Sequence, residues 1–155
     1  MIAEAGLRAD SVHVFPVRVY FEDTDVSGMV YYANYLKSVE RGWTEMLRAV
    51  ALDHQRMMRD DGLAFAVKRC ETDYLVPARL DDQLEAHTGN LKIEGASLWA
   101  AQVIKRGTDD VVSVRVCLVC LTTEGSGRPA RLPGAVRTAL GPLYESQNQH
   151  RIKER

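Results

Sequence analysis

The chain has 155 residues and a mass of 17.4 kDa, the size of a single domain. Apolar residues make up 46% and charged residues 26%, as in ordinary globular proteins, so the chain can bury a core without disulfide bonds or metals. The formal net charge of -1 and the scattered lysines and arginines exclude the strongly basic face typical of nucleic-acid binders. The longest uninterrupted apolar run, residues 116–121, is far shorter than the roughly 18 residues of a membrane span. Glu4, Arg8 and Asp10 interrupt the start of the chain, so we expect no signal peptide and a cytoplasmic protein.

The first predicted strand runs from Val12 to Phe21, where apolar and polar residues alternate. Pro16 lies inside this strand and indicates an edge position or a bulge, because proline cannot donate to a neighbouring strand. A polar loop, residues 22–28, follows. From about Tyr32 to Val50 the apolar residues recur at helical spacing, which predicts a long helix packed against a large surface.

The remaining pattern is mostly that of strands. Residues 53–62 are expected to form a short helix or loop that ends at Gly62. Four further strands are predicted at 64–75, 84–93, 97–105 and 111–122, with a hairpin turn at 107–110. A terminal helix is expected at 133–140, followed by a polar tail to residue 155. The order of strand, long helix and four strands predicts an α+β domain with a five-stranded, largely antiparallel sheet and one long helix on a single face.

The last predicted strand is apolar on both alternating sets of residues, apart from Ser113 and Arg115. This indicates a central place under the helix, or a second face that a partner chain covers. Cys117 and Cys120 lie in this strand with C-x2-C spacing. Positions three apart on a strand point to opposite faces, so we expect two buried structural cysteines and not a shared metal site. Cys70 completes an odd number of cysteines, as expected in a reducing compartment.

Two carboxylates, Asp23 and Asp25, lie just before Gly28 and the predicted helix. One interpretation is a polar turn in which the aspartates accept backbone hydrogen bonds. The other is a catalytic carboxylate beside a helix N-terminus, where free N–H groups can stabilise a developing oxyanion. In that case Gly28 would allow a close approach of backbone or ligand. The four histidines lack metal-ligand spacing, and no phosphate-binding or dinucleotide-binding glycine motif is present.

The run Arg18-Val-Tyr-Phe-Glu-Asp-Thr-Asp25-Val-Ser-Gly28-Met-Val-Tyr-Tyr-Ala-Asn-Tyr35 resembles the signature of the hotdog-fold thioesterases related to 4-hydroxybenzoyl-CoA thioesterase. It is most similar to their bacterial branch associated with the Tol-Pal system, as is the run Tyr74-Leu-Val-Pro-Ala-Arg-Leu-Asp-Asp82-Gln-Leu84. The resemblance covers residues 14–123. It implies one hotdog domain over residues 1–155, with its core at about 12–123, its sheet wrapped around the long helix, and a C-terminal helix and tail at about 133–155.

The resemblance implies a role for individual residues. Asp25 corresponds to the catalytic carboxylate of the family, as nucleophile or general base, and Asp23 to an aspartate that holds the loop. The backbone N–H of Tyr32 corresponds to the group that polarises the thioester carbonyl, at a position where many members of the branch have histidine. Tyr35 is expected to pack in the core or to form a pocket wall. Glu40 is a weaker catalytic alternative, because some hotdog enzymes use a helix glutamate, although its helical position predicts an exposed charge.

The resemblance therefore implies an acyl-CoA thioester hydrolase that needs no cofactor and no metal. Two alternatives stay open: hydrolysis of acyl-acyl-carrier-protein, and a non-catalytic acyl-thioester binding or scaffold protein linked to the cell envelope. Arg128, Arg131 and Arg137 could form a docking patch for a carrier protein, contact the phosphates of coenzyme A, or be solvated. A homo-oligomer is expected, with a dimer of dimers as the implied homotetramer.

Overall fold

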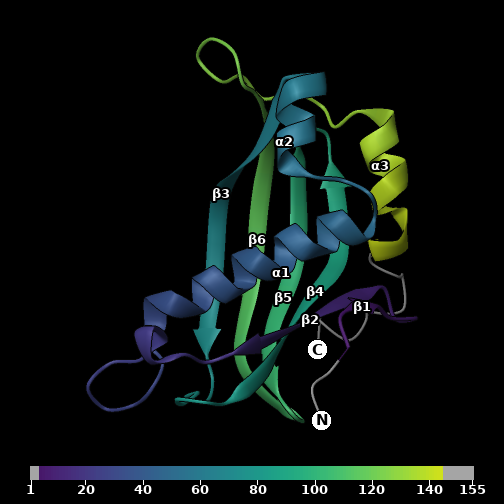
Figure 1. Ribbon diagram of the computed structural model, residues 1–155. Coiled ribbons are helices and arrows are strands. Elements are labelled where there is room, and N and C mark those ends of the chain that lie inside the picture. Colours follow the sequence, from purple (N-terminus) through teal and green to yellow (C-terminus); the bar gives the residue numbers. More distant parts are fainter. Residues whose placement is uncertain (1–3, 145–155) are drawn as a thin grey trace.

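The computed structural model describes residues 4–144, and its six antiparallel strands form one sheet in the order β1-β2-β4-β5-β6-β3 (Figure 1). The strands are β1 (Gly6–Leu7), β2 (Val12–Arg18), β3 (Leu63–Tyr74), β4 (Gln83–Glu94), β5 (Ser97–Arg106) and β6 (Asp109–Thr122). The α+β class and the antiparallel sheet are confirmed, but the expected number of five strands is wrong. The additional strand, β1, has two residues and pairs with β2 at Val14 and His13, too short a segment for any periodic pattern.

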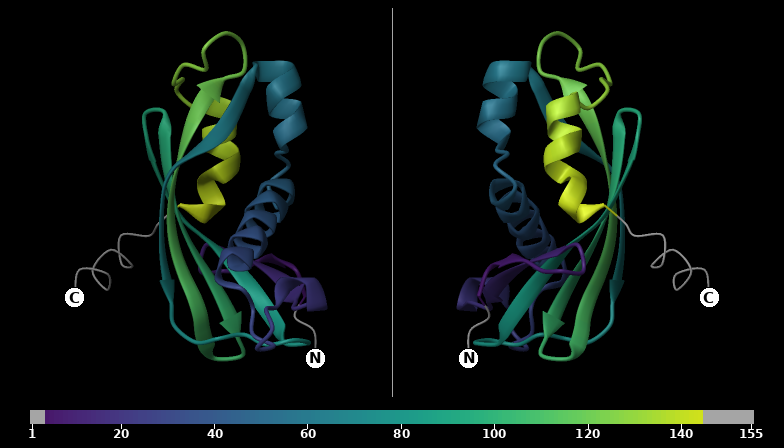
Figure 2. Two further views of the ribbon diagram at one scale, coloured as in Figure 1. Left: turned by 90° about the vertical axis from the view of Figure 1, so that its left-hand side faces the viewer. Right: turned by 90° about the vertical axis from the view of Figure 1, so that its right-hand side faces the viewer.

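The helices lie on one side of the curved sheet (Figure 2). They are α1 (Tyr35–Ala49), α2 (His54–Arg56) and α3 (Gly134–Leu140). The long helix was predicted from Tyr32, but residues Tyr32–Asn34 form a separate 3-10 turn before α1. A π-helical turn, Met57–Asp61, follows α2 and ends at Gly62, whose left-handed backbone suits glycine. The helix expected at 133–140 is confirmed as α3, and the predicted tail beyond 144 lies outside the described residues.

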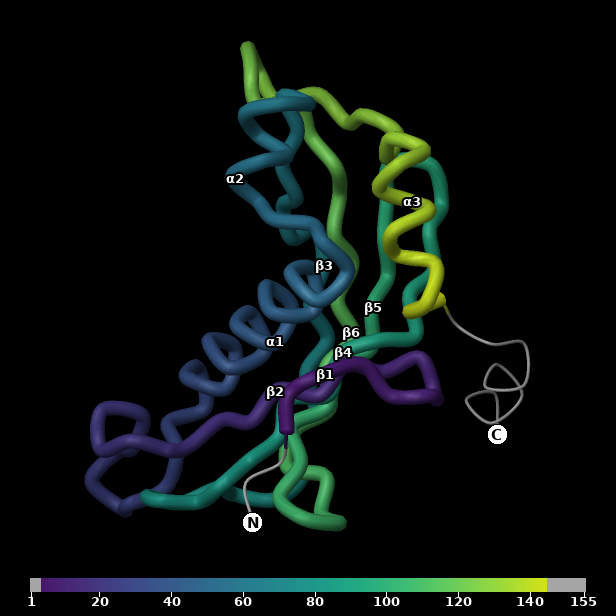
Figure 3. Tube along the Cα trace, turned by 45° about the vertical axis from the view of Figure 1, so that its right-hand side comes forward, coloured from purple at the N-terminus to yellow at the C-terminus, as the bar shows by residue number. Residues whose placement is uncertain are grey.

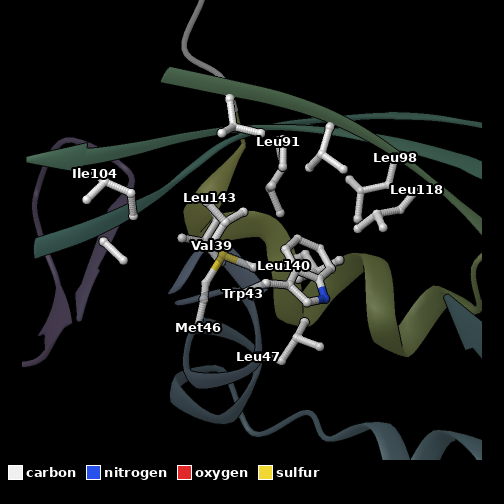
Figure 4. Close-up of a cluster of buried hydrophobic side chains, with 14 of the residues drawn as sticks. Val39, Trp43, Met46, Leu47, Leu91, Leu98, Ile104, Leu118, Leu140 and Leu143 are labelled. Atoms are coloured by element: carbon white, nitrogen blue, oxygen red, sulfur yellow. The ribbon is translucent and has the colours of Figure 1, made fainter. Parts of the chain in front are cut away.

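The core lies between α1, α3 and the inner face of the sheet (Figure 4). Met46 and Leu47 of α1 are completely buried, and the Trp43 ring meets the Phe65 ring of β3 edge to face, with 5.8 Å between centroids. Leu140 of α3 is also completely buried in this cluster. Burial of a side chain of this size stabilises the fold by about 1.5–3 kcal/mol. The apolar stripe that predicted the long helix is therefore the face that α1 packs onto the sheet.

A buried polar contact holds α1 close to the sheet at its middle. Gln102 of β5 donates from Nε2 to the Val39 carbonyl of α1 at 2.8 Å and to the Thr88 hydroxyl of β4 at 3.2 Å. Gly42 of α1 faces the same region, where an added Cβ would lie 3.0 Å from the Ala86 Cβ. A glycine there lets helix and sheet approach closely, and the amide satisfies a buried polar group. The position of α1, and hence of its N-terminal end, is fixed by these contacts.

The cysteine prediction for β6 is confirmed by the strand register. Cys117 pairs with Trp99 on the outer face of the sheet, and Cys120 pairs with Phe65 on the inner face. Both are buried and free, whereas Cys70 is exposed on β3. β6 lies between β5 and β3, so it is an interior strand of the sheet. Arg115 interrupts the apolar pattern on the outer face. Its guanidinium stacks over the Trp99 ring, 4.4 Å from the ring centroid.

The two edges of the sheet differ in length. Pro16 pairs with Glu85 on one side only, because β1 reaches no further than Val14, so the predicted edge position is confirmed. At the other edge, β3 pairs with β6 and with no other strand of residues 4–144. β3 has 12 residues, so it presents a long row of backbone groups that a further strand could use.

Candidate active site

A tight loop before α1 carries the aspartate pair (Figure 3). The Gly28 N–H donates to the Asp25 carbonyl at 3.0 Å, and the Asp25 N–H donates to the Met29 carbonyl at 2.9 Å. Gly28 has a φ of 78°, a left-handed conformation that favours glycine, while nothing lies within 4 Å of an added Cβ. The requirement for glycine here comes from the turn, not from a close contact within the chain. Asp25 is the first residue of the turn 25–28 at the tip of this loop.

The Asp25 carboxylate is exposed, and one of its oxygens is held by Ser27. Oδ1 accepts the Ser27 backbone N–H at 2.8 Å and also the Ser27 hydroxyl. These hydrogen bonds, the hydroxyl first, lower the pKa of Asp25 below its ordinary value, and the Met29 N–H adds to the effect. Among residues 4–144 the hydrogen bonds to the carboxylate go to Oδ1, and none is formed to Oδ2. Asp25 is therefore an ionised carboxylate with one oxygen fixed and the other available.

Asp23 holds the loop, as the sequence indicated. Its Oδ2 accepts the Tyr20 N–H at 2.8 Å. Its backbone carbonyl accepts the Tyr31 N–H at 2.9 Å and the Asn34 side-chain amide at 3.0 Å. The side chain and the backbone carbonyl of Asp23 both accept hydrogen bonds from other residues of the chain. Asp23 therefore joins the loop to the segment just before α1.

Tyr32 begins the 3-10 turn that leads into α1. The first N–H groups of a helical segment have no intrahelical acceptor. The Tyr32 N–H has no other hydrogen-bond acceptor within the part of the chain that the structure describes. Its side chain is 60% exposed. The backbone donor that the sequence assigned to Tyr32 is therefore free to bind a ligand.

A cleft of about 420 Å³ brings Asp25 and Tyr32 together. Its other lining residues come from the loop, the helix start and the end of β3: Met29, Val30, Tyr31, Tyr35, Tyr74, Leu75, Val76 and Pro77. Tyrosine rings form a continuous row along it, with centroids 4.9 Å apart for Tyr31 and Tyr32 and 6.0 Å apart for Tyr32 and Tyr74. The walls are therefore largely apolar and suit an acyl group beside a carboxylate.

Tyr35 both packs in the core and forms part of this wall. It is buried, its ring lies 5.9 Å from the Tyr74 ring, and its hydroxyl accepts the Ala78 N–H at 2.9 Å. Burial, the largest cause, raises the pKa of Tyr35, so the phenol stays neutral. The two interpretations offered for Tyr35 from the sequence are both correct.

The segment from Tyr74 to Pro77 was not assigned to the site from the sequence. Its only signal was the family-like run Tyr74-Leu-Val-Pro, to which no role was given. In the structure the segment leaves the end of β3 and forms the wall of the cleft opposite the start of α1. Its side chains are apolar or aromatic, and Leu75 is 55% exposed.

Other candidates lie away from the cleft. Glu40 is exposed on α1, where the Thr44 hydroxyl donates to it at 3.4 Å, and it does not line the cleft. Arg128 lies beside the start of β3, because its carbonyl accepts the N–H of Thr122 at 2.9 Å and Thr122 pairs with Leu63. Arg137 lies on α3, where it donates to the Leu132 and Gly95 carbonyls. Because β3 has 12 residues at about 3.3 Å each, Arg128 and Asp25 lie near opposite ends of a strand roughly 36 Å long.

Two kinds of feature are absent from the described residues 4–144. No group of three or more histidine, cysteine, aspartate or glutamate side chains is arranged to hold a metal ion. No helix is long and apolar enough to cross a membrane.

The model of one protein family, the thioesterase-like superfamily, matches residues 19–140. The chain belongs to this family. The matched region begins just before the Asp25 loop and ends with α3, so the region contains every residue that lines the cleft.

Individual relatives agree with this assignment. The acyl-CoA thioesterase YbgC of Haemophilus influenzae is 38% identical over 134 residues, covering 86% of this chain and 98% of the relative. A probable thioesterase from Bartonella henselae is similar in structure, with a TM-score of 0.73 and 35% identity over 79% of this chain and 99% of that one. A thioesterase of Thermus thermophilus, solved in complex with coenzyme A and Zn, has a TM-score of 0.72 and 26% identity, over 88% of this chain and 96% of that one. The thioesterase-like chain thus has the hotdog-like fold of these enzymes, with a six-stranded sheet.

Proposed function

We propose that this protein hydrolyses acyl-CoA thioesters to the free acid and coenzyme A, with Asp25 as the catalytic carboxylate. The observation that carries the proposal is the shared cleft, in which an ionised Asp25 oxygen and the unpartnered Tyr32 N–H are both available. The name of the Haemophilus relative, an acyl-CoA thioesterase, supports the substrate class. Coenzyme A bound to the Thermus thioesterase supports it independently.

In this mechanism the Tyr32 N–H binds the thioester carbonyl oxygen and stabilises the negative charge that develops on it. Asp25 Oδ2 attacks the carbonyl carbon, and the carbon–sulfur bond breaks to release the thiolate of coenzyme A. Water then hydrolyses the resulting mixed anhydride, which restores the carboxylate and releases the acid. The alternative is a general-base step in which Asp25 takes a proton from water. The lowered pKa of Asp25 makes it a weak base and favours direct attack.

The cleft is open in one protomer, and we propose that a second copy covers it. Tyr31, Tyr74 and Leu75 expose 47%, 48% and 55% of their surface around the catalytic loop. The unpaired edge of β3 ends in the same region at Tyr74. A large exposed apolar rim beside a long free strand edge is typical of a protein interface. A dimer formed along β3, and a dimer of dimers as the homotetramer, is the assembly we propose.

In such a dimer the two β3 strands run antiparallel, so the start of one lies beside the end of the other. Arg128 and Arg131 of one copy then approach the Asp25 loop of its partner. Their charges suit the phosphates of coenzyme A or the acidic surface of an acyl carrier protein. We propose a cytoplasmic enzyme of the Tol-Pal-associated branch on the similarity of the Asp25 motif.

The test is thiol release from a panel of acyl-CoA thioesters, with wild type beside Asp25→Asn. An absorbance assay of the thioester bond avoids thiol reagents, because Cys70 is exposed. The Asn variant keeps the size of the side chain and should lose activity by about 10² or more. Asp10→Asn is the matched control, since Asp10 is an exposed aspartate between β1 and β2, at the edge of the sheet opposite β3. Full activity of a folded Asp25→Asn enzyme would contradict the assignment.

The same panel separates the alternatives. An enzyme that is inactive on every acyl-CoA but hydrolyses acyl-acyl-carrier-protein would be a carrier-protein thioesterase. Saturable acyl-CoA binding without turnover on either substrate would indicate a binding or scaffold protein.

A further inference from the structure

The segment that joins β3 to β4, residues 75–82, both lines the cleft and supports the catalytic loop. Leu75, Val76 and Pro77 lie in the cleft wall. Further along, the Ala78 carbonyl accepts the Val30 N–H at 2.9 Å, and the Leu80 N–H donates to the Gly28 carbonyl at 3.2 Å. A backbone bridge between Met29 and Arg79 lies between these two bonds. The loop that carries Asp25 is therefore joined to the segment along a short antiparallel ladder.

One guanidinium group holds both ends of this segment. Arg106, the last residue of β5, donates from Nη1 to Asp82 Oδ2 at 2.7 Å and to the Pro77 carbonyl at 3.2 Å. Asp82 Oδ2 also accepts the Arg79 N–H at 2.9 Å. The Arg106 and Asp82 side chains are 32% and 25% exposed. The pair is thus largely shielded from water, where a charged hydrogen bond has a firm geometry.

The segment is held from the helix side as well. The Tyr35 hydroxyl of α1 accepts the Ala78 N–H at 2.9 Å. Both Arg106 and Asp82 are close enough to influence the pKa of Tyr35, although burial is the larger cause. The segment is therefore held between the end of β5 and the start of α1, two elements that pack together in the core.

We propose that Arg106 is a positioning residue of the active site. With Asp82 it fixes the 75–82 segment, and through the ladder of that segment it sets the position of the Asp25 loop and the cleft wall. Neither Arg106 nor Asp82 lines the cleft, so the effect is indirect. This inference rests on the proposed role of Asp25.

Arginine suits this place better than lysine. Its planar guanidinium can serve a carboxylate and a carbonyl at once, in fixed directions. Lysine keeps the charge, but its ammonium rotates on a flexible stem and does not fix the directions of its N–H groups. Arg106→Lys is therefore expected to retain part of the effect, and Arg106→Gln none of it.

The kinetic test compares Arg106→Gln and Arg106→Lys with Lys105→Gln, the matched control. Lys105 is the neighbouring residue of β5 and also forms an ion pair, 3.0 Å from Asp110, but it does not contact the segment. Arg106→Gln should lower kcat by about 10- to 100-fold, the size expected for a displaced catalytic group, with a smaller change in KM. Arg106→Lys should fall between Gln and wild type, and Lys105→Gln should match wild type.

A double-mutant cycle distinguishes positioning from a general loss of stability. If Arg106 acts through Asp25, the residual activity of Asp25→Asn falls no further when Arg106→Gln is added. If Arg106 only stabilises the fold, the two losses multiply. Multiplied losses would overturn the proposal. An Asp25→Asn enzyme with wild-type activity would overturn the proposed function instead.

Hydrogen exchange gives a readout that needs no substrate. Arg106→Gln should speed exchange of the Val30, Ala78 and Leu80 amides, which form the bonds of the ladder and its anchor. Core amides of β5 and β6 should keep their protection, and Lys105→Gln should leave all of these rates unchanged. Unchanged exchange at the three amides in Arg106→Gln would overturn the proposal whatever the activity.

Discussion

Ser27 binds a single oxygen of Asp25 twice, through its backbone N–H at 2.8 Å and through its hydroxyl. The hydroxyl bond is the main cause of the lowered pKa of Asp25. Both donors reach Oδ1, so Oδ2 has no hydrogen bond from Ser27, and Asp25 is a lining residue of the cleft. Ser27 therefore lowers the pKa of the carboxylate and leaves Oδ2 as the oxygen that it does not bind.

The first prediction concerns the acid side of the pH profile. Ser27→Ala removes the hydroxyl donor, so the pKa of Asp25 should rise towards its ordinary value. The acid limb of kcat/KM, which reports an essential carboxylate in the free enzyme, should move to higher pH. At neutral pH Asp25 is ionised in both proteins, so activity there should change by less than about tenfold.

Ser27→Thr is the control for this substitution, because threonine keeps the hydroxyl and the backbone N–H. Its acid limb should coincide with that of wild type. An unmoved limb in Ser27→Ala would show that another group controls the acid side of the profile.

A second prediction follows from the weak basicity of Asp25. Direct attack joins the acyl group to the carboxylate, so a rapidly quenched single turnover should contain an Asp25 peptide heavier by the acyl mass. In 18O-labelled water, label should enter Asp25 when water opens the anhydride at the aspartyl carbon. Asp25→Asn should show neither signal. Label found only in the product, with no acylated peptide at any time point, would favour the general-base step.

The sequence predicted the elements whose side chains are periodic. The helical stripe of Trp43, Met46 and Leu47 and the alternating strands leave a clear pattern, because one face of each is buried in the core. The two-residue β1 and the separate 3-10 turn at Tyr32–Asn34 leave none, since they are set by backbone contacts.

The contrast between side-chain patterns and backbone contacts also explains which part of the candidate site the sequence predicted. Asp23, Asp25 and Gly28 form a local turn, which a short motif can reveal. The contribution of residues 75–82 depends on backbone bonds such as Val30 to Ala78, which join segments far apart in the chain and place no demand on side-chain type. The role proposed for Arg106 was not predicted from the sequence, because its partners Pro77 and Asp82 belong to the 75–82 segment, far from Arg106 in the chain.

A third prediction tests the free edge of β3. In solution the protein should have a mass well above the 17.4 kDa of one chain, measured by size-exclusion chromatography with light scattering. Val67 lies on this edge and is 63% exposed. Val67→Lys places a charge where the partner strand would pair, which should shift the mass towards one chain and lower activity with it.

Leu7→Lys is the control, because Leu7 is 38% exposed on β1, at the opposite edge of the sheet. It should leave the mass unchanged. A wild-type protein that stays monomeric, or a Val67→Lys protein with the wild-type mass, would contradict assembly along β3.

His13 provides a prediction about stability instead of catalysis. It is a buried residue of β2, and its Nδ1 has no hydrogen-bond partner among residues 4–144. Burial, the largest cause, lowers its pKa below 6.5; nearby Arg8 adds to this and Glu45 opposes it. The folded protein therefore resists a proton that the unfolded chain accepts.

Stability should consequently fall as the pH drops below 6.5, because the unfolded chain then binds more protons than the folded one. The free energy of unfolding should decrease by up to about 1.4 kcal/mol per pH unit from this group, until the folded state is protonated as well. His13→Gln removes the titration and should flatten that part of the profile in urea unfolding between about pH 5 and 7. Equal slopes in His13→Gln and wild type would assign the acid sensitivity to other groups.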